Sequence, residues 1–249
     1  MTKDAAFDAI LLDFEAVETR DAVAALSAQQ RVLLHDYWID RARGELTTAL
    51  TFEFMLADLE VEAAPAELLA LARTAIADEH RHVDWCLRWA NLIDPARPAH
   101  PELSGTSPLE LDGASAHDNR LLRTVFGCCF SETVAIHVLT RSHGQITLPS
   151  VRRLNQEHMK EEVGHARLGW ALVAWPGLSA RDRSMLAAYV PEMLRLVRMV
   201  WQSTLRAPDA HLHELGFLSS AIIDPACDEA IEGVVLPGLE RARVVPARS

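Results

Sequence analysis

The chain has 249 residues, a net charge of −11 and no basic cluster, which argues against nucleic acid or an anionic membrane as a partner. Its length suits one large domain with a sizeable core, or at most two small ones. Aromatic residues make up only 6 % of the chain and β-branched runs are short. These proportions are typical of an all-α protein.

The first half of the chain predicts an N-terminal arm, two long helices and an irregular crossover, from helical periodicity and from the positions of proline and glycine. The expected bounds are 1–20 for the arm or short helix, Asp21 or Ser27 to about Leu59 for the first long helix, about Pro65 to Leu92 for the second, and 94–117 for the crossover.

The second half predicts two further bundle helices and additional C-terminal helices. Their expected bounds are about Asp118 to Ser142, about Leu148 to Trp175, about Ser179 to Leu205 with a kink or break near Pro191, and about Pro225 to Arg243. The whole is predicted to be a single domain over 1–249, with a four-helix bundle at about 21–175 and extra helices at about 178–243.

The chain shows no sign of secretion or of membrane insertion. Its start lacks a basic and then apolar signal segment, and its longest uncharged run, Leu168 to Ala180, is shorter than the ~20 residues that a bilayer requires. The four cysteines, Cys86, Cys128, Cys129 and Cys227, have no metal-binding or redox spacing. We therefore expect a cytoplasmic protein with reduced, buried thiols.

The motif Glu-x-x-His occurs twice, at Glu79/His82 and at Glu162/His165. Residues three apart in a helix lie on one face, so each motif can direct a carboxylate and an imidazole at the same point. Chance alone can produce such motifs. The argument therefore rests on the glutamates that precede them by about 30 residues in predicted helices.

Helix lengths indicate which upstream glutamates face the motifs. Glu132 and Glu162 are separated by similar lengths of helix on either side of a turn near 144–149, and Glu45 and Glu79 are related in the same way. Glu53 is the rival of Glu45, but the helical segment from Glu53 to the turn would be much shorter than the segment from the turn to Glu79. A bundle with two single glutamates and two Glu-x-x-His motifs can bind two metal ions. The predicted ligands are Glu45, Glu79, His82, Glu132, Glu162 and His165.

The predicted ligands favour two iron ions, with manganese as the alternative. Two divalent ions neutralise four buried carboxylates, which would otherwise be costly to bury. Mixed carboxylate and imidazole ligands suit metals that accept oxygen donors and change oxidation state, whereas zinc would leave open coordination positions unused.

The first motif resembles the D-E-x-R-H element of bacterial di-iron monooxygenases in the ferritin-like superfamily. It reads Asp78-Glu79-His80-Arg81-His82. The resemblance implies that Asp78 holds an imidazole of the opposite half and that Arg81 braces the carboxylates. We expect His80 to point away from the metals. In the second half, Glu161 stands at the position of Asp78 and Gly164 replaces the arginine. The alternative is that Asp78, Arg81 and Glu161 form salt bridges on an exposed helix face.

His158 precedes Glu162 by one turn and shares its face, which makes it a seventh candidate ligand; a satisfied core histidine is the alternative. This His-x-x-x-Glu-x-x-His pattern resembles the p-aminobenzoate N-oxygenase family over about residues 45–165. The resemblance implies a di-iron enzyme that N-oxygenates arylamines. The alternatives are a ferritin-like hydroxylase or oxidase acting on carbon, an iron-storage protein, and a helical scaffold without metal.

The implied partners are dioxygen, a small organic substrate and an electron donor, with a homodimer as a candidate assembly. Several other residues are predicted to pack in the core or against neighbouring helices. They are Gly44, Ala49, Ala135, Trp85, Trp89, Trp170 and Trp175. For Gly44 the alternative is a local helix distortion that aims Glu45. For the four tryptophans the alternative is a role in electron transfer. Arg41 and Cys128 precede Glu45 and Glu132 by one turn.

Overall fold

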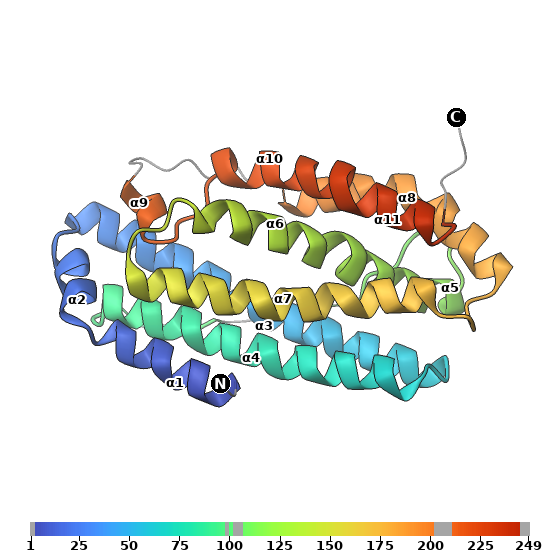
Figure 1. The fold of residues 1–249 in the computed structure, drawn as a ribbon, viewed down its shortest axis with the longest axis horizontal. Helices are drawn as coiled ribbons and strands as arrows, with labels where there is room; N and C mark the ends of the chain where they lie inside the picture. The colour runs from blue at the N-terminus through green and yellow to red at the C-terminus, as the bar shows by residue number, and fades with distance from the viewer. Residues whose placement is uncertain (1–2, 98–99, 102–106, 202–210, 245–249) are drawn as a thin grey trace.

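The computed structural model of the protein describes residues 3–97, 100–101, 107–201 and 211–244. Within these residues the chain is all-helical and contains no strand, as the composition predicts. Figure 1 shows long helices lying side by side along the longest axis of the molecule, with the C-terminal helices stacked on one side of them.

Two pairs of long helices make up the centre of this bundle. The first pair is α3 (Ala28–Val61) and α4 (Ala66–Ile93), and the second is a continuous helical run followed by α7 (Pro149–Ala174). The continuous run consists of α5 (Ala116–Thr124), a π-helical segment η1 (Val125–Ser131) and α6 (Glu132–His143). α4 packs against both α3 and α7, and α7 packs against α6, so the two pairs share one core.

The long first helix begins after Ser27, which confirms one of the two predicted starts. Ser27 accepts a hydrogen bond from the Gln30 backbone amide at 3.2 Å, while the Gln30 side chain accepts one from the Ser27 backbone amide at 2.9 Å. This capping box satisfies backbone amides that a helix start leaves without partners. The alternative start at Asp21 is wrong, because that residue belongs to a separate helix, α2 (Val17–Ala24).

The N-terminal segment forms a helix rather than a loosely held arm. Helix α1 (Lys3–Phe14) packs against α4 and α7, and the Phe14 ring stacks on Trp89 with 5.2 Å between ring centroids. Ile10 is also fully buried. Burial of these apolar side chains holds the segment on the bundle.

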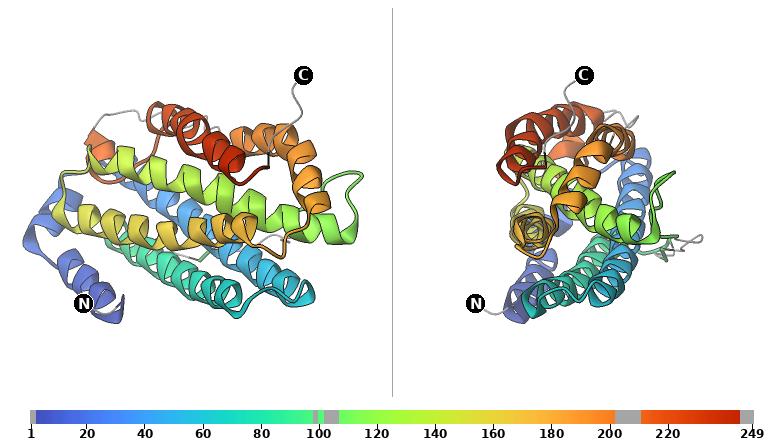
Figure 2. Two further views of the ribbon diagram at one scale, coloured as in Figure 1. Left: turned by 45° about the vertical axis from the view of Figure 1, so that its right-hand side comes forward. Right: turned by 90° about the vertical axis from the view of Figure 1, so that its right-hand side faces the viewer.

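The C-terminal helices lie over α6 and over the helical run that precedes it (Figures 1 and 2). Their bounds are Ala180–Trp201 for α8, His211–Glu214 for α9, Ser220–Ala230 for α10, Ile231–Val235 for the π-helical η2, and Leu236–Arg241 for α11. α8 contains Pro191 and bends along its length, as predicted (Figure 2). The part of its predicted range beyond Trp201 lies outside the described residues.

The predicted start of the last helix at Pro225 is wrong. Helix α10 begins at Ser220 and contains Pro225 in its interior. A proline removes one backbone hydrogen bond from a helix. The preceding turn forms nevertheless, because it buries Ile222 completely and Ile223 almost completely.

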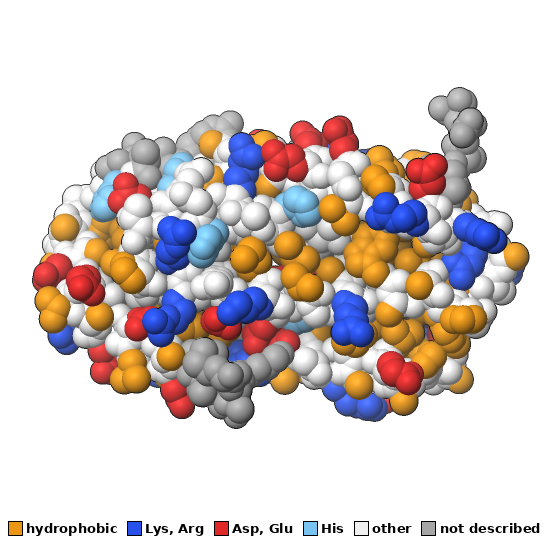
Figure 3. Space-filling model, in the orientation of Figure 1, with side chains coloured by type: hydrophobic (Ala, Val, Ile, Leu, Met, Phe, Trp, Pro, Cys, Tyr) orange, Lys and Arg blue, Asp and Glu red, His pale blue; other side chains and the backbone are white. Residues whose placement is uncertain are grey.

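The apolar helix Ala116–His143 is the one helix of the described residues that is long and apolar enough to span a bilayer. However, 67 % of its apolar stretch is buried inside the protein, as expected for a core helix. On the face in Figure 3, basic, acidic and apolar side chains are interspersed. The four cysteines are buried and free of disulfides, as predicted.

Candidate metal centre

The bundle brings all seven predicted site residues to one place in its core. Two groups of four side chains meet there, and in each group one potential ligand atom per residue lies within 4.8 Å of the others. The first group is Glu45, His82, His158 and Glu162, and the second is Glu79, Glu132, Glu162 and His165. Glu162 belongs to both. These glutamates and histidines, all buried except the partly exposed Glu45, could hold a metal ion.

Glu45 lies at the candidate site, whereas Glu53 does not. The turn between α3 and α4 lies at 62–65, so Glu45 reaches the level of Glu79, whereas Glu53 is exposed nearer the turn. The Glu45 side chain is 15 % exposed. Glu79, Glu132 and the histidines are buried.

A π-helical segment directly precedes Glu132, and the sequence reasoning did not foresee it. In η1 the backbone hydrogen bonds join residues five positions apart, compared with four in an α-helix. This extra residue shifts the following residues around the helix axis. Such segments are rare and often occur at functional sites. The distortion that was considered at Gly44 is absent, because α3 is α-helical throughout Ala28–Val61.

Close contacts join the carboxylates and imidazoles. His165 Nδ1 lies 2.9 Å from Glu162 Oε2 and 3.0 Å from Glu79 Oε1. His82 Nδ1 lies 3.3 Å from Glu79 Oε2 and 3.8 Å from Glu162 Oε1. His158 Nε2 lies 2.7 Å from Glu162 Oε1. Each imidazole therefore turns one nitrogen towards Glu162, the glutamate that both groups share.

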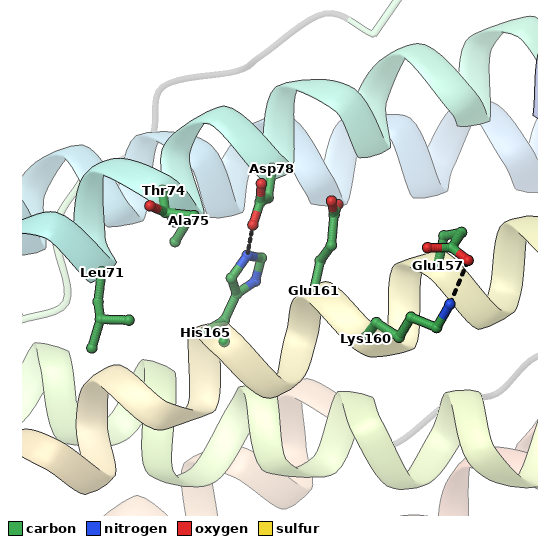
Figure 4. A pocket seen from close by; sticks show the side chains of 9 residues that line it. Leu71, Thr74, Ala75, Asp78, Glu157, Lys160, Glu161 and His165 are labelled. Carbon is green, nitrogen blue, oxygen red and sulfur yellow. Dashed lines mark hydrogen bonds and ion pairs between the residues drawn. The ribbon is translucent and has the colours of Figure 1, made fainter. Parts of the chain in front are cut away.

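The outer nitrogens of two histidines face carboxylates from the opposite helix. His82 Nε2 lies 3.0 Å from Glu161 Oε2, and His165 Nε2 lies 3.5 Å from Asp78 Oδ2. Figure 4 shows the second contact across the groove between α4 and α7. Arg81 donates hydrogen bonds to Glu161, at 2.9 Å, and to Asp78. Carboxylates in this position orient a metal-binding imidazole.

These contacts agree with the roles that the resemblance implies for Asp78, Glu161 and Arg81. The alternative of an exposed face is wrong for the two carboxylates, whose side chains are 3 % and 9 % exposed. His80 is exposed, as expected of a residue that points away from the site.

Burial and the neighbouring charges shift the protonation of the site strongly. Burial, reinforced by Glu162 and Glu79, raises the pKa of Glu132 well above its usual range. Although burial alone would raise it, His165 and His158 hold the pKa of Glu162 well below that range.

Two of the three imidazoles have raised pKa values, which favours their protonated forms. Although burial opposes it, hydrogen bonds with Glu161 and Glu79 raise the pKa of His82 to about 10. Burial also opposes the charge of His165, whose pKa is nevertheless raised well above its usual value, first by Glu162. The metal-free site therefore holds protons that a bound cation would displace.

His158 differs from the other two histidines. Burial and the nearby His82 lower its pKa, and the two rings are 3.9 Å apart between centroids. Its outer nitrogen, Nδ1, lies 3.2 Å from Arg41 Nη2 rather than from a carboxylate. Arg41 also lies 3.5 Å from Glu45 Oε1 and stacks on the Trp38 ring at 4.7 Å.

A cavity of about 380 Å³ adjoins the site. Its polar part includes Tyr37, Arg41 and five carboxylates, while α6, α8 and α10 contribute apolar side chains. The residues that line it are Tyr37, Asp40, Arg41, Gly44, Glu45, Thr48, Glu79, Ser131, Glu132, Ala135, Val138, Leu139, His158, Glu162, Val200, Trp201, Leu218 and Ile223. A small organic molecule in this cavity would contact both the carboxylates and an apolar wall.

The expectation that Gly44 serves a close helix contact is wrong. A Cβ atom at Gly44 would meet nothing within 4 Å, because the residue borders the cavity. Ala135 also lines the cavity rather than only packing, whereas Ala49 and Cys128 are fully buried in the core.

The tryptophans are mainly core residues, as expected. Trp85 and Trp89 are buried, and Trp170 and Trp175 are half-buried against the core. Trp85 nevertheless stacks on His82, with 5.3 Å between ring centroids. Sequence reasoning missed Tyr37, although it lies on the same face of α3 as Arg41 and Glu45, at positions i, i+4 and i+8. It also missed the wall from α8 and α10, for which the sequence carries no signal.

A second, smaller cavity of about 240 Å³ lies between α4 and α7, where Figure 4 shows it. Of the seven candidate ligands it reaches only His165, and it also borders Asp78 and Glu161. A Cβ atom at Gly164 would meet nothing within 4 Å, so the absence of a side chain there helps to keep the groove open.

Comparisons of the chain with protein-family models, with curated proteins and with solved structures gave no match. The resemblance to the N-oxygenases therefore remains a prediction from the motifs. The geometry of the site does not depend on it.

Proposed function

We propose that this protein is a dioxygen-activating di-iron oxygenase with a ferritin-like bundle. The observation that carries the proposal is the meeting of two four-residue groups that share Glu162. Two helices contribute one carboxylate each, Glu45 and Glu132, and two contribute Glu-x-x-His. This division of ligands among four helices is that of carboxylate-bridged di-iron bundles.

The donor set fits a pair of divalent ions. Four carboxylates balance the charge of two such ions, and each four-residue group adds imidazole nitrogen to carboxylate oxygen, as iron and manganese prefer. Once bound, an iron pair would supply the electrons that reduce dioxygen. Glu161 and Asp78 hold two imidazoles in orientation, and the fully buried Phe52, 5.2 Å from the His165 ring, helps to exclude water.

We propose a small organic amine as the substrate and its nitrogen as the site of oxygenation. The cavity borders Glu45, Glu132 and His158, so a molecule bound in it lies beside the proposed ions. Its apolar wall of Val138, Leu139 and other side chains suits an aromatic ring. The preference for nitrogen over carbon comes from the resemblance of the His158 motif. A separate electron donor would reduce the metal pair between turnovers.

The test begins with the metal. Protein purified without oxygen and reconstituted with Fe²⁺ should hold about two irons per chain, as measured by elemental analysis. Absence of bound iron, or a single ion, would falsify the di-iron centre. Glu53→Gln is a matched control, since Glu53 is an exposed glutamate of the helix that carries Glu45.

Turnover then separates the candidate reactions. The reduced, iron-loaded protein is exposed to oxygen with a panel of arylamines and a matched panel of compounds that offer only C–H bonds. Hydroxylamine, nitroso or nitro products detected by mass spectrometry support N-oxygenation, whereas products from the second panel alone support a hydroxylase. Accumulation of many irons per chain in a hollow shell on size-exclusion chromatography would instead indicate storage.

A further inference from the structure

Arg41 distinguishes the two halves of the candidate metal centre. Its guanidinium contacts two members of the first group, at 3.5 Å from Glu45 Oε1 and 3.2 Å from His158 Nδ1. We call this group, Glu45, His82, His158 and Glu162, the arginine half-site. We call the other, Glu79, Glu132, Glu162 and His165, the open half-site. In the described part of the chain, no lysine or arginine forms an ion pair with a member of the open half-site.

The Arg41 side chain is a permanent cation within the core. It is only 13 % exposed, and a guanidinium does not lose its proton in proteins. Its charge offsets that of Glu45, whose carboxylate is also largely withdrawn from water. In the metal-free protein it thus supplies part of the positive charge that a metal ion would bring to the arginine half-site.

The contact with His158 also stabilises the metal-free form of the arginine half-site. Arginine can only donate hydrogen bonds, so His158 Nδ1 must accept. The proton of the neutral imidazole then sits on Nε2, which lies 2.7 Å from Glu162 Oε1 and can donate to it. Nε2 is the nitrogen that faces the other ligands, and a metal ion needs it without its proton. Both Glu45 and His158 are therefore engaged before any ion arrives.

The cavity gives Arg41 room to withdraw. Arg41 lies on its wall, and Gly44, one turn further along the same face, leaves open space where a side chain would stand. The Trp38 ring lies 4.7 Å from the guanidinium carbon, within cation–π distance. A change of side-chain rotamer would turn the guanidinium into the cavity without movement of the helix.

We propose that Arg41 is a positioning residue that holds the arginine half-site in its metal-free form, so that the two ions bind in a fixed order. The open half-site fills first. The second ion binds only when the guanidinium leaves Glu45 and His158, which weakens its apparent affinity. This inference rests on the two-ion centre of the proposed function, but it does not depend on the reaction that the centre performs.

The test is a Co²⁺ titration of metal-free protein, followed by visible absorption and by calorimetry. Loss of one hydrogen-bonded charge contact corresponds to about tenfold or more in affinity, so the wild type should show two steps separated by at least about that factor. In Arg41→Met the second step should tighten towards the first. The metal-free variant should also melt at a lower temperature than the wild type, because Glu45 loses its partner.

Two further variants control the experiment. Arg43→Met removes an exposed arginine of the same helix, one that pairs with Asp40, and should leave both steps unchanged. Arg41→Lys keeps the charge and should keep the steps apart. Arg41→Gln also removes the charge but keeps a polar side chain, and it replaces the methionine variant if that variant fails to fold.

The outcomes separate this inference from the proposed function. Equal affinities for both ions in the wild type, or a weaker second step in Arg41→Met, would overturn the role of Arg41. A wild type that binds no Co²⁺ overturns both. Ordered binding that is lost in Arg41→Met supports the role of Arg41 even if no substrate is oxygenated, which would overturn the proposed reaction alone.

Discussion

Glu162 is the residue whose loss should affect the centre most, because it is the only glutamate common to both four-residue groups. Glu162→Gln keeps the shape of the side chain and removes its charge. The two carboxylate oxygens of Glu162 lie near different imidazoles, Oε1 at 2.7 Å from His158 and Oε2 at 2.9 Å from His165. We therefore expect the substitution to weaken both metal-binding steps, whereas Glu132→Gln should weaken mainly one.

The size of the effect follows from the charge lost. Two unit charges about 4 Å apart interact by about 4 kcal/mol at an effective dielectric constant of about 20, and a divalent ion increases that attraction. Desolvation of the ion offsets part of it. A net loss of about 4 kcal/mol per ion corresponds to about a thousandfold weaker binding. In the metal-free protein, protonated His82 and His165 would also lose a buried partner, which typically costs about 3–5 kcal/mol of folding stability.

The assay is iron per chain after reconstitution, together with a Co²⁺ titration and thermal melting of the metal-free protein. Circular dichroism verifies that Glu162→Gln remains helical. The exposed control Glu53→Gln should match the wild type in all three measurements. Retention of two irons with affinities within about tenfold of the wild type would show that Glu162 is not shared between two ions.

Three more predictions concern single positions. Glu45→Ala should lose metal and Glu53→Ala should keep it, as measured by elemental analysis; the opposite result would assign the ligand to Glu53. His158→Ala should retain substantial iron but change the absorption spectrum and lose N-oxygenation, and a variant identical to the wild type in both would make His158 a core residue. His117 lies 2.9 and 3.0 Å from two carboxylates, which raise its pKa. Its contribution to folding stability should therefore be complete below pH ~6.5 and should fade as the pH rises through its pKa in the folded protein. His117→Gln should therefore lower the free energy of unfolding by less than about 1 kcal/mol, since the side chain is 36 % exposed, and only at low pH; an equal loss at pH 9 in urea denaturation would contradict this.

The positions of the candidate ligands could be predicted from the sequence because they depend on regular helical geometry. The spacing of Glu79 and His82 places both on one face, and equal helix lengths on either side of a turn place Glu45 level with Glu79. The same reasoning selected Glu45 over Glu53, and the exposure of Glu53 agrees with it. Helix periodicity acts locally, so a single chain carries enough information for such predictions.

Boundaries and backbone irregularities were harder to predict. The start of α10 at Ser220, before Pro225, is decided by the burial of the preceding turn against the rest of the protein. The π-helical segment before Glu132 likewise has no signal in the sequence. Both outcomes depend on what each turn packs against, and packing partners come from distant parts of the chain.

The sequence by itself therefore determined the helical class, the two Glu-x-x-His motifs and the register that brings their partners to the same level. Only the tertiary structure decided the surroundings of the site. The contact of Arg41 with His158 joins α3 to α7, and side chains of α8 and α10 line the cavity that borders Gly44. The physical reason is that spacing along a helix follows from local backbone geometry, whereas neighbours across helices depend on how the whole core packs.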